Sequence, residues 1–94
     1  MNIYDVILSK SAEKDLRQIP AHVVLKLQAW VDDVKHQGLN NVRKIPGYHD
    51  EPLQGKRKGQ RSIRLSKAYR ANYVIKENGQ IEFIEIIEVN KHEY

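Results

Sequence analysis

Hydrophobic positions follow two different spacings along the chain, and the order of these spacings predicts the fold. Residues 2–8 are rich in β-branched and other apolar side chains, which predicts a short strand. After them the apolar positions recur every three or four residues, which indicates helices. Ser9 or Ser11 can cap the first helix, Pro20 separates it from a second, and Gly38 ends the second. We expect an antiparallel helical hairpin whose apolar stripes are Ala12, Leu16 and Ile19, then Val23, Leu27, Trp30, Val31 and Val34.

The second half of the chain has the two-residue alternation of half-buried strands. Residues 38–55 carry glycine, proline and asparagine at short intervals and predict a loop. Residues 61–67, 69–76 and 81–89 predict three strands, and Asn78-Gly79 predicts a two-residue hairpin turn between the last two. Because the last strand has apolar residues on both of its faces, we expect it to lie in the centre of the sheet.

The alternation also assigns side chains to the two faces of the sheet. Ile63 and Leu65 share one face, and Arg64, Arg70 and Asn72 lie on the other. The helical hairpin should cover the apolar face, which gives an open, concave face that carries the polar residues. The expected fold class is therefore α+β with two layers: an N-terminal strand and a helical hairpin pack on one face of a small antiparallel sheet with a mixed edge. We expect residues 1–94 to form this one domain.

Positive charge is concentrated in one segment of the predicted sheet. The chain has 16 basic and 12 acidic residues, and seven of the basic ones lie between Lys56 and Arg70, where no residue is acidic. The rest of the chain therefore has a net charge of −3. Such a local density of positive charge favours binding to a nucleic acid, although a solvated strand surface is the simpler alternative. The seven residues are Lys56, Arg57, Lys58, Arg61, Arg64, Lys67 and Arg70.

Composition excludes several kinds of site. The chain has no cysteine, hence no disulfide framework and no thiolate chemistry, and this is compatible with the cytoplasm. Residues 1–20 lack the apolar run of a signal peptide, and no segment is long and apolar enough for a membrane span. No pair of histidines or carboxylates has the spacing of metal ligands, so we expect neither a metal nor a cofactor.

The C-terminus provides residues that could cleave RNA. His92 and Tyr94 follow the last strand, whose hairpin partner begins at Tyr69 and Arg70, so these residues are expected to lie together. Attack by the RNA's own 2′-hydroxyl needs a proton acceptor, a positive charge beside the phosphate and a proton donor for the leaving 5′-oxygen. Histidine can donate or accept the proton and arginine can hold the phosphate. A solvated histidine and a frayed terminal tyrosine are the alternatives. His49 by itself is a loop histidine, and it is the next candidate only if the C-terminal residues are not catalytic.

Three motifs together resemble the toxins of the RelE/ParE superfamily, and the HigB branch in particular. They are the segment from Leu53 to Arg64 (LQGKRKGQRSIR), the Tyr69-Arg70 pair that opens the next strand, and the terminal His92-Glu93-Tyr94. The resemblance implies a RelE-like fold and a type II toxin that acts as a ribosome-dependent mRNA endonuclease. By this resemblance Arg64 contacts a phosphate, Arg70 braces the scissile phosphate, His92 and Tyr94 occupy catalytic positions, and His49 corresponds to a histidine before the "P-L-x-G" segment.

The resemblance also implies partners. These are a cognate antitoxin, expected to be a small helix-turn-helix protein, and mRNA in the decoding site of the small ribosomal subunit. Operator DNA would be contacted only through the antitoxin. Two alternatives stay open: a ParE-like toxin that inhibits DNA gyrase by binding it, and a non-catalytic RNA-binding module. Which group acts as the general base also stays open. The predicted catalytic residues are Arg64, Arg70, His92 and Tyr94, and the predicted nucleic-acid-binding residues are Lys56, Arg57, Lys58, Arg61, Lys67, Lys91 and His49.

Overall fold

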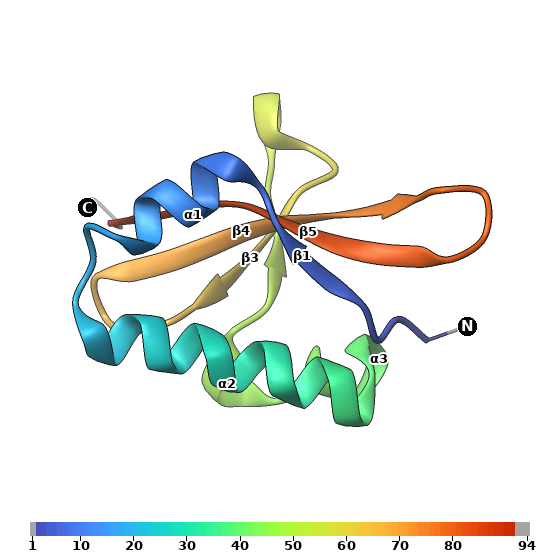
Figure 1. Cartoon of the computed structure of the whole chain (residues 1–94), viewed down its shortest axis with the longest axis horizontal. Coiled ribbons are helices and arrows are strands. Elements are labelled where there is room, and N and C mark those ends of the chain that lie inside the picture. Colours follow the sequence, from blue (N-terminus) through green and yellow to red (C-terminus); the bar gives the residue numbers. More distant parts are fainter. Residues whose placement is uncertain (1, 92–94) are drawn as a thin grey trace.

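The computed structural model describes residues 2–91, and its sheet is built around β5. This strand has β4 on one side and β1 on the other, and the full order is β1-β5-β4-β3-β2 (Figure 1). β1 runs parallel to β5, whereas the other pairs are antiparallel. The predicted mixed edge and the central position of the last strand are confirmed. The strands are β1 (Val6–Leu8), β2 (Glu51–Pro52), β3 (Arg61–Arg64), β4 (Tyr69–Glu77) and β5 (Glu82–Lys91).

The two predicted helices run antiparallel, as expected, but they take different positions against the sheet (Figure 1). α1 (Lys10–Leu16) begins at the N-cap Ser9, whose Oγ accepts a hydrogen bond from the Ala12 backbone N–H at 3.0 Å. α1 ends at Leu16, earlier than the predicted end near Pro20, because Arg17 and Gln18 donate to closer carbonyls in a tight turn. α2 (Ala21–Gln37) follows Pro20.

α1 lies along the edge of β5 beyond the end of β1. The backbone N–H of Ser9 donates to the Ile86 carbonyl at 2.9 Å, and its hydroxyl donates to the Ile87 carbonyl at 3.0 Å. Six residues later, an Asp15 carboxylate oxygen accepts from the Val89 N–H at 2.9 Å. α1 thus satisfies backbone groups that a longer β1 would otherwise pair, and this part of the edge is closed to further strands.

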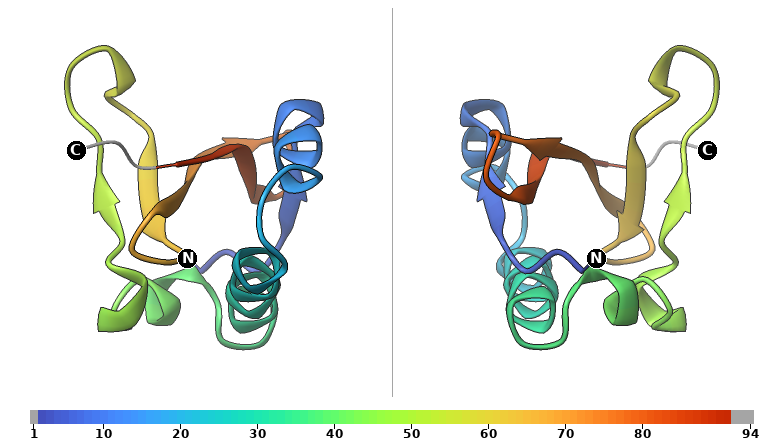
Figure 2. Two further views of the ribbon diagram at one scale, coloured as in Figure 1. Left: turned by 90° about the vertical axis from the view of Figure 1, so that its left-hand side faces the viewer. Right: turned by 90° about the vertical axis from the view of Figure 1, so that its right-hand side faces the viewer.

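α2 supplies most of the helical side of the core. Its residues Val23, Leu27, Trp30 and Val34 are buried, as the stripe predicts. The Trp30 ring packs against the Tyr73 ring of β4 with centroids 5.3 Å apart and an interplanar angle of 42°. Figure 2 shows that the sheet is strongly curved, so that β4 and β5 cover one side of the core and β3 and β2 cover an adjacent side. The buried apolar residues of the strands are Ile63, Ala71, Tyr73, Ile84, Ile86 and Val89, and Leu65 is buried just after β3.

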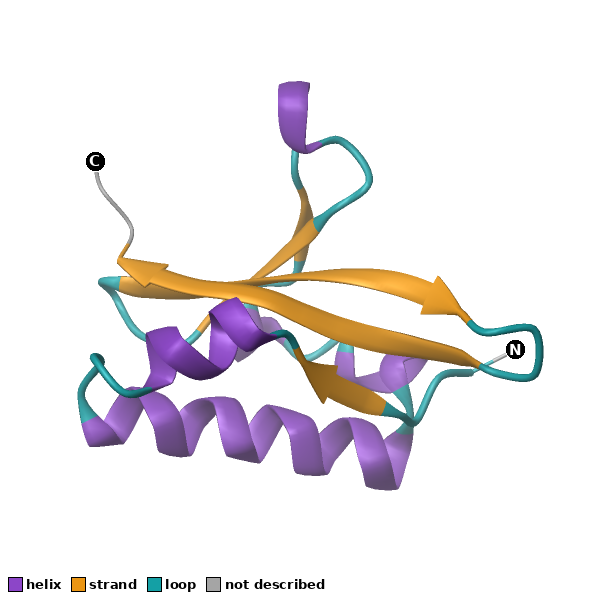
Figure 3. Cartoon of the chain, turned by 45° about the horizontal axis from the view of Figure 1, so that its top comes forward, coloured by secondary structure: helices purple, strands orange, loops and turns teal. Residues whose placement is uncertain are grey.

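The segment predicted as a loop contains four short elements. Two of them are single helical turns that anchor Leu39, Val42 and Tyr48 in the core. The prediction also missed β2, because Glu51-Pro52 has low β-propensity and pairs over only two residues; Pro52 is acceptable there because β2 is an edge strand. The helical pieces are α3 (Leu39–Val42) and the 3-10 turns η1 (Pro46–Tyr48) and η2 (Gly55–Arg57). η2 projects from the sheet at the top of Figure 3.

The hairpin between β4 and β5 is confirmed, with its tip one residue later than predicted. The Asn78 N–H donates to the Ile81 carbonyl at 3.2 Å, so the turn is centred on Gly79 and Gln80. Gly79 has a φ of 90°, and the Asn78 side chain accepts from the N–H groups of Gln80 and Ile81.

None of the helices that the structure describes is long and apolar enough to cross a membrane.

Gly38 is expected to be intolerant of a side chain. Its φ of 83° and ψ of 154° lie in a region that is essentially restricted to glycine, and a Cβ there would collide with the Asn2 amide. We expect Gly38→Ala to lower the free energy of unfolding by about 1–3 kcal/mol. Denaturant unfolding would measure this. Gly47→Ala is the matched control, because Gly47 has open space around its Cβ position and no positive φ.

Candidate nucleic-acid interface and active site

Two rows of polar side chains cross the outer face of the sheet, the face away from α2. In the first row Glu51 of β2, Ser62 of β3, Asn72 of β4 and Glu88 of β5 are successive cross-strand partners. In the second row Arg64, Arg70 and Asn90 are partners in the same way. The register therefore brings together Arg64, Arg70 and Asn72, as the alternation predicts, and adds carboxylates at both ends of the first row.

Arg64 and Arg70 face each other directly across β3 and β4. Like charges at opposed positions of an antiparallel pair destabilise the pairing, so this arrangement is costly to the fold. Arg64 is exposed and its guanidinium has no hydrogen-bond or ion-pair partner among residues 2–91. A phosphate between or beside the two guanidinium groups would relieve the repulsion.

Arg70 is held in place by two neighbours on the polar face. Its Nε donates to Ser62 Oγ at 2.6 Å, and its Nη2 donates to Glu51 Oε1 at 3.0 Å. The side chain of Arg70 is only 12% exposed, less than an open sheet face would suggest, because Ser62 and Glu51 contact its guanidinium. The guanidinium is thus oriented before any ligand arrives, and some of its five donors remain for a ligand.

Glu51 connects Arg70 to His49. Glu51 Oε2 lies 3.3 Å from His49 Nε2, while Oε1 of the same carboxylate accepts from Arg70. The Glu51 side chain is 47% exposed. His49 has a left-handed backbone, with φ 47° and ψ 52°, which is uncommon for a residue other than glycine. An exposed carboxylate next to a fixed arginine is a candidate proton acceptor.

A cavity of about 270 Å³ opens on this face. Glu51 and Arg70 line one part of it, and Arg57, Asn72 and Asn90 line another. Asn72 Nδ2 donates to Glu88 Oε1 at 2.6 Å, and the same oxygen accepts from the Arg57 guanidinium. Burial of the Glu88 carboxyl acts to raise its pKa, but the hydrogen bonds from Arg57 and Asn72 outweigh burial and hold the pKa below its usual value.

Six of the seven predicted binding residues are exposed, and Arg61 is the exception. Lys56, Lys58 and Lys91 are exposed, and their side chains have no partner among the described residues. Arg57 lines the cavity. Lys67 is exposed in the turn between β3 and β4. His92 and Tyr94 lie outside the described residues. Lys91 is the last described residue, and its strand partner is Tyr69, which precedes Arg70.

Arg61 points to the other face of β3, toward the core. Its Nε donates to Asp50 Oδ1 at 2.6 Å, and Asp50 Oδ2 accepts from the Tyr73 hydroxyl at 2.5 Å. Burial lowers the pKa of Arg61, but the hydrogen bond and charge of Asp50 raise it further than burial lowers it. Burial and the same carboxylate raise the pKa of Tyr73. Because Asp50 neutralises Arg61 internally, we leave Arg61 out of the proposed interface.

Sequence reasoning did not assign a role to Glu51, Ser62 or Glu88. Ser62 is two residues before Arg64, so the strand alternation places both side chains on the same face, and the sequence could have predicted that Ser62 lies at the site. Glu51 joins the site only through β2, and Glu88 only through a β-bulge, where Asn72 pairs with Glu88 but Tyr73 pairs with Ile86. Neither feature has a clear signal in the sequence.

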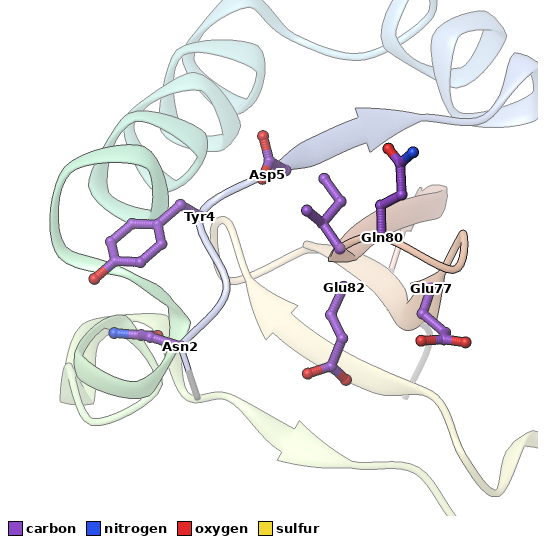
Figure 4. A pocket seen from close by; sticks show the side chains of 7 residues that line it. Asn2, Tyr4, Asp5, Glu77, Gln80 and Glu82 are labelled. Atoms are coloured by element: carbon purple, nitrogen blue, oxygen red, sulfur yellow. The ribbon is translucent and has the colours of Figure 1, made fainter.

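A larger cavity, of about 410 Å³, lies far from the polar face, between the N-terminal segment and the tip of the β4–β5 hairpin (Figure 4). The charged residues that line it are acidic: Asp5, Glu77 and Glu82. An anionic ligand is repelled from such a lining. Residues 2–91 also contain no group of three or more histidine or carboxylate side chains that could hold a metal ion. We therefore place the candidate site at the smaller cavity beside Arg70.

The backbone of this chain superimposes on the backbones of solved toxin structures. No family model matches the sequence, and no curated protein matches it either. YafQ from E. coli superimposes with a TM-score of 0.72 and 18% identity over 94% of this chain and 92% of YafQ. The structure of the E. coli DinJ–YafQ toxin–antitoxin complex gives a TM-score of 0.68 and 20% identity, over 98% of this chain and 94% of the matched chain. The structure of a YoeB dimer from Staphylococcus aureus gives a TM-score of 0.67 and 20% identity, over 100% of this chain and of the matched chain.

At identities this low the likeness establishes the fold. The chain has the same two-layer α+β fold as the YafQ and YoeB structures, so the expected RelE-like architecture is confirmed. These structures do not single out the HigB branch.

Proposed function

We propose that the chain is the toxin of a type II toxin–antitoxin pair and cleaves mRNA on the ribosome. The observation that carries the proposal is the position of Arg70, which Ser62 and Glu51 hold at a cavity opposite the unpaired Arg64. A fixed arginine and a proton acceptor are two of the three groups that cleavage by the 2′-hydroxyl requires. The fold shared with the YafQ and YoeB structures supports the assignment.

The proposed reaction uses the RNA's own 2′-hydroxyl as nucleophile. Glu51 accepts the 2′ proton, and the resulting oxygen forms a bond to phosphorus. The bond from phosphorus to the 5′-oxygen breaks, and that oxygen leaves with the electron pair and takes a proton. The products are a 2′,3′-cyclic phosphate and a free 5′-hydroxyl. Arg70 and Arg64 offset the negative charge that develops on the phosphate oxygens.

Glu51 is a better candidate for the base than Glu88. The Glu88 carboxylate accepts from Arg57 and Asn72, and its lowered pKa makes it a weaker base. Glu51 is more exposed and lies beside the guanidinium that would hold the phosphate. His49, at 3.3 Å from the second Glu51 oxygen, orients this carboxylate. The proton for the leaving oxygen is proposed to come from His92 or Tyr94.

Binding to the ribosome is proposed to depend on the exposed lysines. Lys56 and Lys58 flank Arg57 at η2, and neither has a partner among residues 2–91. Neutralising phosphates of ribosomal RNA releases counterions, so binding should weaken steeply with salt. The same lysines could also bind an acidic segment of a cognate antitoxin through their positive charge. A reaction on translating ribosomes would take place in the cytoplasm.

Arg70→Gln tests the assignment. The glutamine keeps a polar group beside Ser62 but removes the guanidinium, so we expect cleavage of translated messages to slow by about 10²–10³-fold. Primer extension on messages in a purified translation system measures the rate, and thermal unfolding checks the fold. Lys35 is exposed on α2, on the other side of the sheet from the cavity, so the control Lys35→Gln should cleave normally.

The same preparation distinguishes the competing functions. Wild-type protein that leaves messages intact but inhibits DNA supercoiling by gyrase would overturn the nuclease proposal in favour of a ParE-like toxin. Protein that binds RNA but neither cuts messages nor affects gyrase would leave the RNA-binding module as the function.

A further inference from the structure

A β-bulge in β5 turns Glu88 toward the polar face. Ile84 and Ile86 are both buried in the core, and uninterrupted alternation would place Glu88 on the same side. Ile87 is the extra residue of the bulge, so Glu88 instead becomes the partner of Asn72 on the outer face. Bulges next to functional sites often re-aim one side chain in this way.

The re-aimed Glu88 ties η2 to the sheet. Its Oε1 accepts from Arg57 of η2, 31 positions away in the sequence, and from Asn72 Nδ2 at 2.6 Å. η2 is otherwise a projecting turn, bounded by Gly55 and Gly59 with positive φ (Figure 3). A cation on such a turn samples many positions unless something holds it. The Glu88 side chain is 26% exposed, so the contact is partly shielded from water.

The contacts of Arg57 leave most of its donors free. Both of its hydrogen bonds, to Glu88 and to Gln60 Oε1, use Nη1. Its Nε and Nη2 have no partner among the described residues. Arg57 lines the same cavity as Arg70, and its side chain is 48% exposed. A guanidinium held through one nitrogen and open at the other two is suited to grip a phosphate.

We propose that Glu88 is a positioning residue that holds Arg57 at the cavity, where Arg57 binds a second phosphate of a single-stranded RNA. This inference extends the proposed function, because the second phosphate would belong to a nucleotide next to the one whose phosphate Arg70 holds. Arg57 is then part of the substrate site, whereas Lys56 and Lys58 serve long-range attraction. The class of ligand is a single-stranded RNA with at least two consecutive phosphates.

The direction in which Glu88→Gln changes the affinity for RNA distinguishes a positioning role from a simple effect of charge. Removing a carboxylate from a site for a polyanion should strengthen binding if charge alone matters. If Glu88 positions Arg57, the same change should weaken binding, because a neutral glutamine lacks the negative charge that attracts the guanidinium and holds it less firmly. Glutamine still presents an oxygen to Asn72, so the sheet should keep its pairing.

The experiment measures the binding of a short, uncleavable 2′-O-methyl RNA oligonucleotide by fluorescence anisotropy. We expect Glu88→Gln and Arg57→Ala each to weaken binding on the order of tenfold. The double variant should be no weaker than Arg57→Ala alone, because Glu88 acts through Arg57. Glu82→Gln is the matched control: Glu82 is exposed at the far end of β5, and its loss should leave binding unchanged or slightly tighter.

A second measurement tests the positioning role without any RNA. Amide hydrogen exchange of residues 55–59 should speed up in Glu88→Gln and stay at the wild-type rate in Glu82→Gln. Unchanged exchange, or tighter RNA binding by Glu88→Gln, would overturn the proposal.

Failure of this inference is distinguishable from failure of the proposed function. If wild-type protein cuts messages while Glu88→Gln and Arg57→Ala bind the oligonucleotide like wild type, the inference fails and the nuclease stands. If wild-type protein never cuts messages but binding shows the Glu88 dependence, the nuclease fails and the phosphate subsite stands.

Discussion

Replacing Glu51 by glutamine is expected to slow the cleavage of messages on ribosomes by about 10²–10⁴-fold, the usual contribution of a general base. The glutamine retains an oxygen that can accept from Arg70, at the 3.0 Å contact that Glu51 makes, but it cannot take the 2′ proton. Because the Glu51 side chain is 47% exposed, the change should cost little stability. Single-turnover primer extension at saturating protein would isolate this chemical step from binding.

The matched control is Glu77→Gln, which removes a carboxylate at the end of β4, far from the cavity, and should cleave at the wild-type rate. Normal cleavage by Glu51→Gln would show that the base is elsewhere. His49 would then be the next residue to test, since it lies 3.3 Å from Glu51.

Replacing Asp50 by alanine is expected to lower the free energy of unfolding by about 3–5 kcal/mol. The Asp50 side chain is 0% exposed and accepts from both Arg61 and Tyr73. Without it, a partly buried guanidinium and the hydroxyl of a buried tyrosine lose their partner at the same time. Breaking a buried pair from one side is costly because the remaining charge is still desolvated. Urea unfolding followed by Trp30 fluorescence would measure the loss.

Asp32→Ala is the control for this prediction, because Asp32 is an exposed residue of α2 whose side chain has no ion pair among residues 2–91. Its cost should stay within about 0.5 kcal/mol. A loss of less than about 1 kcal/mol in Asp50→Ala would mean that Arg61 and Tyr73 find other partners or water, and that the Asp50 contacts contribute little to the fold.

Local patterns in the sequence predicted part of the candidate site. Successive side chains of a strand point to opposite faces, so the alternation alone was enough to put Arg64, Arg70 and Asn72 on one face, where the strand register has them. The same alternation groups Arg61 with Ile63 on the core face. The charge of Arg61 outweighed this signal in the prediction, and the structure shows Arg61 paired with Asp50.

Other members of the site depend on contacts between distant segments. Glu51 reaches Arg70 because β2 pairs with β3 over two residues, too few to leave a periodic pattern. Glu88 reaches Arg57 because a bulge in β5 reverses the alternation. Segments 19 and 31 positions apart meet in these contacts, and a propensity computed over neighbouring residues carries no information about them.

By itself, then, the sequence determined the order of the major elements, the apolar stripe of α2, and the concentration of positive charge on β3, β4 and the turn before them. These properties follow from local spacing and composition. Only the tertiary structure decided which cations are free to bind a ligand. Arg61 is neutralised by buried Asp50, Arg70 is oriented by Ser62 and Glu51, and Arg57 is held by Glu88. Each of these outcomes requires a carboxylate or hydroxyl from another strand or loop, and strand register, not local sequence, sets that distance.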